Sequence, residues 1–154
     1  MYHYTESGLD NVWLANGYKK KETPYGEGVA IADADKLDET IARCLVNKPG
    51  RLTGKELRFL RTTLGLAQHS LATMMDVTDQ SVSLWERTGR VPKLQDAVLR
   101  KLVLEHLEGD GKLSDMIERT NIVERLMNQQ IVVRTRDHNW TAKRQAEKPE
   151  MEIA

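Results

Sequence analysis

Short polar and basic side chains gather between residues 78 and 93, and their chemistry suits hydrogen bonding to DNA. Gln80 can bond N6 and N7 of adenine together, whereas Ser83 can touch a thymine methyl group or a phosphate. Asp79 can accept a bond from cytosine N4, or it can stabilise the positive end of a helix dipole. The candidate DNA-contacting residues are Gln68, Thr78, Asp79, Gln80, Ser81, Ser83, Arg87, Arg90 and Lys93.

Two short helices are expected before the stretch that holds most of these residues. Leu57, Leu60 and Leu64 recur at helical spacing, and Gly65 ends that pattern. A second helix is expected over residues 68–75, with its apolar side chains on one face.

A third helix is expected to present the polar side chains. Asp76 and Val77 form the predicted turn, after which Thr78 can cap the helix by accepting a bond from a first-turn amide. Val82 and Trp85, three residues apart, would anchor the helix inward. Its polar side chains would then point outward, as a helix in a major groove requires.

The same stretch resembles a known family of DNA-binding proteins, the Xre-type, lambdoid-repressor-like helix-turn-helix. The resemblance rests on Leu-Gly-Leu-Ala-Gln, a later Leu-Ala pair, and Val-Thr-Asp-Gln-Ser-Val-Ser-Leu-Trp-Glu-Arg at fixed offsets. It implies a lambda-repressor-like helix-turn-helix domain, which we place at residues 51–108, whose third helix enters the major groove.

The resemblance also implies roles for three residues inside the motif. In that family the positions of Arg61 and Glu86 often hold a partly buried ion pair that locks the first helix to the third. The position of Gln68 usually bonds a phosphate and braces the third helix; the alternative is a polar residue that simply opens the second helix.

The flank from Lys48 to Arg61 resembles the MqsA-type antitoxin and regulator group. That group commonly carries an N-terminal zinc module with Cys pairs, but this chain has one cysteine and no Cys-x-x-Cys. The zinc module is therefore not expected. Cys44, which lies in a helical pattern beside Leu45, is expected to be a buried thiol.

Residues 1–50 are expected to form a small β-hairpin-plus-helix module in front of the helix-turn-helix domain. Asn16-Gly17 predicts a type I′ hairpin turn, because both positions tolerate positive φ. Asp35 is expected to cap the helix of this module, and residues 47–50 are expected to be a linker.

The fold class expected for the whole chain is mainly α, because helical patterns also dominate the C-terminal half. A further helix and a short strand are expected before a polar, unpatterned tail that should be disordered. The expected segments are 1–50 for the N-terminal module, 51–108 for the DNA-binding domain, 109–136 for the helix and strand, and 137–154 for the tail.

The helix expected from Lys93 to Leu107 carries apolar residues around nearly its whole circumference. A surface helix would show one apolar stripe. One face can complete the core, and we expect the other to contact a second copy, so that residues 92–128 form a homodimer. The alternative is cover by residues 1–50 or by the next helix.

Charge distribution favours DNA as a partner, although the formal net charge of the chain is zero. Residues 51–101 hold nine Lys or Arg against five Asp or Glu, a net charge of +4. This excess is modest, so DNA affinity should depend on dimerisation and specific contacts as well as on charge.

Several other classes of protein are not expected from this sequence. The four histidines are scattered without ligand spacing, so no metal and no cofactor are expected. No catalytic triad or pair of carboxylates stands out, so an enzyme is not expected. No apolar run could span a membrane and no signal peptide opens the chain, which predicts a cytoplasmic, nucleoid-associated protein.

These patterns predict a sequence-specific DNA-binding transcriptional regulator, a dimeric repressor of a palindromic operator. The alternative is an antitoxin that neutralises a partner toxin through residues 1–50 and autoregulates its operon. A factor that uses the same fold to hold protein is a further alternative, disfavoured by outward Gln80 and Ser83 beside a basic flank.

Overall fold

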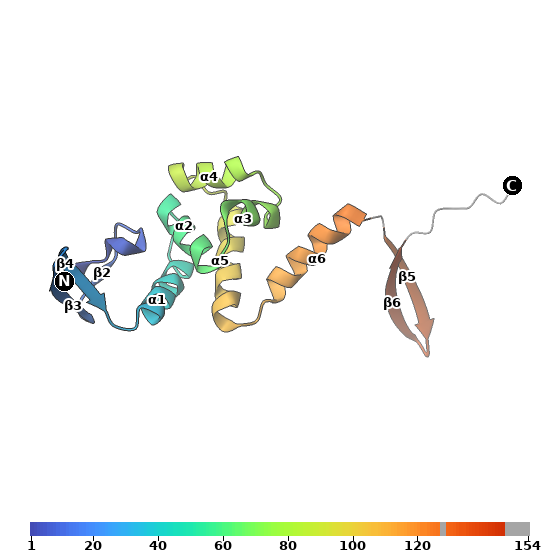
Figure 1. The fold of residues 1–154 in the computed structure, drawn as a ribbon. Helices are drawn as coiled ribbons and strands as arrows, with labels where there is room; N and C mark the ends of the chain where they lie inside the picture. Colours follow the sequence, from blue (N-terminus) through green and yellow to red (C-terminus); the bar gives the residue numbers. More distant parts are fainter. Residues whose placement is uncertain (127–128, 147–154) are drawn as a thin grey trace. The chain divides into compact units, whose positions relative to one another are not determined.

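The computed structural model of this chain is mainly helical, and its described strands pair as small antiparallel hairpins (Figure 1). The structure describes residues 1–126 and 129–146, and the side chains of residues 1–121 and 130–143. The chain divides into two compact units, residues 1–114 and residues 115–154. None of the described helices is long and apolar enough to cross a membrane.

The first unit holds all but one of the described helices in full. Its elements in chain order are β1 (Tyr2–His3), the 3₁₀ helix η1 (Thr5–Ser7), β2 (Trp13–Leu14), β3 (Tyr18–Thr23), β4 (Gly26–Ile31), α1 (Ala34–Val46), α2 (Gly54–Thr63), α3 (Gln68–Met74), α4 (Asp79–Thr88) and α5 (Lys93–Glu108). α6 (Lys112–Leu126) begins in the first unit and continues into the second, which also holds β5 (Gln129–Arg136) and β6 (Asn139–Ala146). β1 pairs with β2, β3 with β4 and β5 with β6.

One hydrophobic core runs through the first unit, and residues 1–50 contribute to it. The buried apolar side chains that share this core include Tyr4, Leu9, Leu14, Ile41, Ala42, Leu45, Leu57, Leu60, Leu71, Val82, Trp85, Leu99 and Val103. The expectation of a separate module at 1–50 is therefore wrong. The side chains of these residues complete the core of the helices that follow them.

α1 shows why residues 1–50 are not separate from the helices that follow. It packs on α5 and α2, and the α5 side chains Leu99, Leu102 and Val103 are buried. Part of the apolar circumference of α5 is thus covered by residues 1–50, which was the alternative to contact with a second copy. Leu94, on the same helix, stays exposed.

The segment expected to be a linker, residues 47–50, is held by two residues of α5. Arg100 donates hydrogen bonds to the carbonyls of Val46 and Lys48, the latter at 2.6 Å, and Asp96 accepts the backbone N–H of Leu52 at 2.8 Å. Asp96 and Arg100 also form an ion pair of 2.7 Å. Pro-Gly composition predicts a turn here, but these contacts fix it against α5.

Three details of the N-terminal prediction are also wrong. Asn16-Gly17 does not join two paired strands: only Gly17 has positive φ, β2 pairs with β1, and the β3–β4 loop lies at Pro24-Tyr25. α1 begins after Asp33, so Asp35 lies inside it, and Cys44 is exposed. The buried residues of α1 are Ile41, Ala42 and Leu45.

The second unit contains a hairpin where a disordered tail was expected from Asp137. β5 and β6 pair over their full lengths, and Asp137 and His138 form the two-residue loop with φ of 52° and 67°. Asp and His tolerate the left-handed region better than most residues, which permits a type I′ loop without glycine. Residues 147–154 of the expected tail lie outside the described residues.

Candidate nucleic-acid interface

α4 carries the sequence-predicted cap and the sequence-predicted anchors. Thr78 Oγ1 accepts the backbone N–H of Ser81 at 3.2 Å, and the two hydroxyl oxygens lie 3.0 Å apart. Val82 and Trp85 are buried in the core. Thr78 and Ser81 thus satisfy hydrogen-bonding groups at the start of the helix, as capping requires.

The opposite side of α4 is turned to solvent. Asp79, Gln80 and Arg87 are exposed, and Ser83 is half-buried. Leu84, which sequence reasoning did not single out, is also exposed. Gln80, Leu84 and Arg87 follow at helical spacing of four and three, so they share one face. This shared spacing was the signal that could have identified Leu84.

A buried polar network fixes α4 to the two preceding helices. Arg61 Nε lies 2.8 Å from Glu86 Oε1, and the two side chains are only 13% and 7% exposed. Arg61 also donates to the carbonyl of Leu66 at 2.8 Å, and Gln68 donates to the other carboxylate oxygen of Glu86. The expected ion pair is present. Gln68 of α3 also braces α4, as expected, through its hydrogen bond to Glu86.

Gly54 sets the distance between α2 and α4. A Cβ atom at Gly54 would lie 2.0 Å from the carbonyl oxygen of Glu86, so only glycine permits this approach. The N-terminus of α2 therefore packs directly on the C-terminal end of α4. No local sequence pattern predicts this contact, because it joins residues 32 positions apart.

His69 of α3 pairs with Asp79, the first residue of α4. Its Nδ1 lies 3.0 Å and 3.1 Å from the two carboxylate oxygens, on the surface of the unit. Asp79 was expected either to contact cytosine or to stabilise the helix dipole, and the contact with His69 was not expected. The pair links the first turn of α3 to the first turn of α4, and it engages the carboxylate oxygens with which Asp79 would accept a bond from cytosine.

Basic side chains continue from the end of α4 to the start of α5. Arg87, Arg90 and Lys93 are exposed, and among the described contacts none of their side chains has a hydrogen bond or an ion pair. Arg51 is also exposed and donates to the carbonyl of Val91 at 2.7 Å, which holds it beside the same loop. Sequence reasoning missed Arg51.

A hollow of about 700 Å³ lies beside the C-terminal end of α4. Arg51, Lys55 and Arg87 line it together with the backbone of Gly54 and Gly89. Lys55 is paired with Asp10 at 2.7 Å, so Arg51 and Arg87 supply its unneutralised positive charge. A concave basic surface of this kind attracts phosphate.

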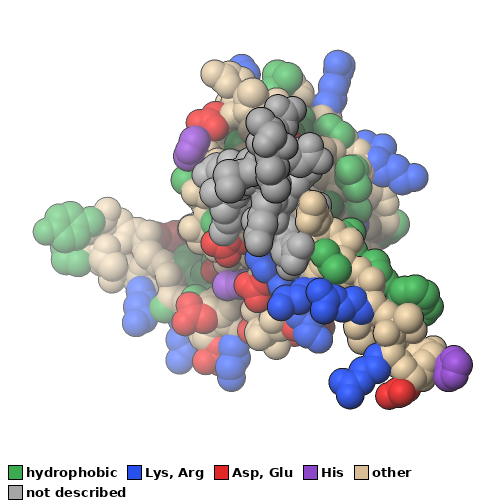
Figure 2. All heavy atoms as spheres, turned by 90° about the vertical axis from the view of Figure 1, so that its right-hand side faces the viewer, with side chains coloured by type: hydrophobic (Ala, Val, Ile, Leu, Met, Phe, Trp, Pro, Cys, Tyr) green, Lys and Arg blue, Asp and Glu red, His purple; other side chains and the backbone are tan. Residues whose placement is uncertain are grey.

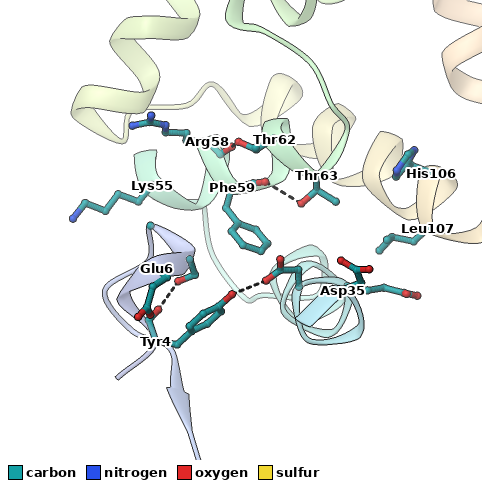
Figure 3. Close-up of a pocket in the computed structure, with 14 residues that line it drawn as sticks. Tyr4, Glu6, Asp35, Lys55, Arg58, Phe59, Thr62, Thr63, His106 and Leu107 are labelled. Carbon is teal, nitrogen blue, oxygen red and sulfur yellow. Dashed lines mark hydrogen bonds between the residues drawn. The ribbon is translucent and has the colours of Figure 1, made fainter. Parts of the chain in front are cut away.

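A larger cleft, of about 880 Å³, lies elsewhere in the first unit (Figure 3). Glu6 and Asp35 line one wall and Lys55 and Arg58 of α2 line the other. Tyr4 donates to Asp38 at 3.2 Å in this cleft, and burial together with that carboxylate raises the pKa of the Tyr4 hydroxyl. Acidic side chains repel phosphate, so the cleft is unsuited to the DNA backbone.

The part of the chain that the structure describes contains no group of three or more His, Cys, Asp or Glu placed to hold a metal ion. Comparisons with protein-family models, with curated proteins and with solved structures found no match for this chain.

Proposed function

We propose that this chain is a sequence-specific DNA-binding transcriptional regulator, a dimeric repressor of a palindromic operator. In this proposal α3, the turn at Asp76-Val77 and α4 form a lambda-repressor-like helix-turn-helix of Xre type. α4 is the helix that enters the major groove, and double-stranded DNA is the partner.

The face of α4 is the observation that carries the proposal. The helix is capped at Thr78, anchored by Val82 and Trp85, and held by Glu86, while Gln80 and Arg87 remain exposed. A rigid helix with hydrogen-bonding side chains on its free side is what direct reading of base edges requires. Leu84 on the same face adds an apolar group that could contact a thymine methyl.

The basic side chains at the C-terminal end of α4 support phosphate contacts beside that face. Arg87 in the last turn of α4, and Arg90 and Lys93 after it, have no carboxylate partner among the described residues, and Arg51 lies beside the same loop. Such contacts position a protein on DNA without reading the sequence. They would place the protein with the nucleoid in the cytoplasm.

Dimerisation through residues 92–128 is part of the proposal, because a two-fold operator presents two half-sites about one helical turn apart. Leu94 and Met116 are exposed large apolar side chains in that range. α1 and α2 cover other parts of α5, so a dimer would use only the side that these two helices leave open.

Binding-site selection from random duplexes with the full-length purified protein tests the proposal. We expect enrichment of a two-fold symmetric sequence. Sedimentation of the selected complex should then give two chains per duplex. Recovery of a random pool after several rounds, with no enriched sequence, would reject a sequence-specific regulator.

The alternative function is an antitoxin that binds a partner toxin through residues 1–50. The observation in its favour is that Tyr25 is fully exposed and Trp13 is 55% exposed, since aromatic residues are enriched where proteins meet. Trp13 is already stacked on His3, with ring centroids 4.1 Å apart. A small toxin-like reading frame directly adjacent to the gene would favour this alternative.

A further inference from the structure

The β5–β6 hairpin carries a second basic surface that the proposed contacts of α4 do not use. Residues 129–146 hold four Lys or Arg against one Asp, a net charge of +3. Side chains alternate between the two faces of a strand, and directly paired residues share a face. The register of the two strands therefore sorts these side chains into two faces.

One face of the hairpin is polar and basic. Arg134 pairs with Thr141 and Arg136 with Asn139, and Lys143 follows on the same face opposite Val132. Arg134, Arg136, Asn139, Thr141 and Lys143 are all exposed. The other face carries the exposed apolar side chains Ile131, Val133 and Trp140. Figure 2 colours exposed side chains by type, and both hydrophobic and basic ones appear on the side that it views.

We propose that the hairpin is a second DNA-binding element, a two-stranded ribbon that lays this polar face into a groove of the duplex. The proposal rests on the proposed DNA-binding function of α4 and extends it. A major groove about 12 Å wide admits a two-stranded β-ribbon as well as it admits a helix. Arg134, Arg136 and Lys143 contact phosphates, and Asn139 has the side-chain type that pairs with adenine.

Charge and size favour DNA over a second copy of the chain as the occupant. The polar face has three cations and no carboxylate among its described side chains, so two copies of it would repel each other. The apolar face is small. Eight-residue strands are about 26 Å long and lie ~4.8 Å apart, so each face covers on the order of 300 Å². Two such faces fall short of the roughly 1,200 Å² of a stable interface.

The test is the salt dependence of DNA binding by the full-length protein on a mixed-sequence duplex of about 40 base pairs, long enough for two half-sites and their flanks. The variant Arg134→Ala, Arg136→Ala, Lys143→Ala removes three contacts. The slope of log affinity against log salt should become shallower by about 2.7, at ~0.9 for each phosphate contact.

The matched control is Lys19→Ala, Lys20→Ala, Lys21→Ala on β3, which removes the same charge from another exposed hairpin. Its slope should stay close to that of the unmodified protein. The charge-conserving variant Arg134→Lys, Arg136→Lys should keep the slope as well, which separates lost contacts from a misfolded hairpin.

The outcomes separate this inference from the proposed function. If the unmodified protein binds DNA and the hairpin variant keeps its slope, the ribbon is not a DNA contact and the role of α4 is unaffected. If the slope became equally shallow in the β3 control, the change would be a general effect of charge, and the proposal that the ribbon binds DNA would be wrong. If Trp140→Ser made the protein monomeric while DNA affinity per chain held, the hairpin would be a dimer surface. No DNA binding at all would reject both proposals.

Discussion

Arg61 of α2 and Glu86 of α4 form an ion pair with 2.8 Å between Nε and Oε1, and both side chains are largely buried. Gln68 of α3 donates to the same carboxylate. Glu86 thus joins α4 to side chains of both α2 and α3, and these contacts hold the orientation of α4. Because desolvated charges depend on their partners, removing one member leaves the other uncompensated.

Glu86→Ala should lower the free energy of unfolding by roughly 3–5 kcal/mol, because it leaves Arg61 buried without its partner. Denaturant melts of both proteins measure this. The matched control is Glu39→Ala, which removes an exposed i,i+4 pair with Arg43 and should cost less than about 1 kcal/mol. Equal losses in the two variants would show that the Arg61–Glu86 pair is not a special buried contact.

Gly54→Ala should destabilise the protein by roughly 1–3 kcal/mol, because its Cβ would overlap the backbone of α4. The predicted Cβ position lies 2.0 Å from the Glu86 carbonyl oxygen, and backbone cannot move aside as a flexible side chain can. Gly28→Ala in β4 is the control, since its nearest neighbour would lie 3.7 Å away. A stable Gly54→Ala protein would mean that α2 and α4 are farther apart than described.

Glu56 should make stability depend on pH in the acidic range. Burial alone would raise the pKa of the Glu56 carboxyl, but the hydrogen bonds from Lys48 and from the Thr53 amide outweigh it and hold the pKa below the ordinary 4.5. The folded state therefore favours the charged form. Its contribution is complete above the unfolded pKa and is lost as pH falls through the folded pKa.

Unfolding free energies measured from pH 7 downward should therefore fall less steeply in Glu56→Gln than in the unmodified protein. Lys48→Met should have a similar effect, because Lys48 Nζ lies 2.6 Å from Glu56 Oε1. Parallel pH profiles for all three proteins would show that Glu56 is charged equally easily in the folded and unfolded chain.

Residues 1–50 should be required for folding of the helices that follow. A chain that begins at Lys48 loses the side chains of Leu9, Leu14 and Leu45 from the shared core, and α5 loses the cover of α1. Within the full-length protein, Leu9→Ala should cost about 2–5 kcal/mol, whereas Tyr25→Ala, at a fully exposed site, should cost less than ~0.5 kcal/mol. A shortened chain with a cooperative melt would contradict this.

The sequence predicted the parts of the candidate site that depend on local signals. The cap at Thr78, the buried anchors Val82 and Trp85, and the end of α2 near Gly65 are confirmed. These features follow from capping chemistry and from helical spacing, which act within a few residues. The Arg61–Glu86 pair was expected from the family resemblance, and the pair itself is present.

The remaining features depend on contacts that no local pattern encodes. The approach of Gly54 to Glu86, the His69–Asp79 pair and the hold of Arg100 on the segment after α1 all join residues distant in sequence. The composition of residues 47–50 indicated a linker. The segment is instead a packed turn, because Arg100 of α5 donates hydrogen bonds to its backbone. The loop Asp137-His138 was missed because it lacks glycine.

Gln80 on α4 is proposed to read a base, and the measurement that tests this most directly is DNA affinity across single-base variants of the selected operator. Gln80→Ala should lose about 1–3 kcal/mol on the preferred sequence and lose its preference at one base pair in each half-site. Arg90→Ala, the matched phosphate variant, should weaken binding to all sequences alike and make the salt dependence shallower. Uniform weakening by Gln80→Ala, with every base preference retained, would contradict the account.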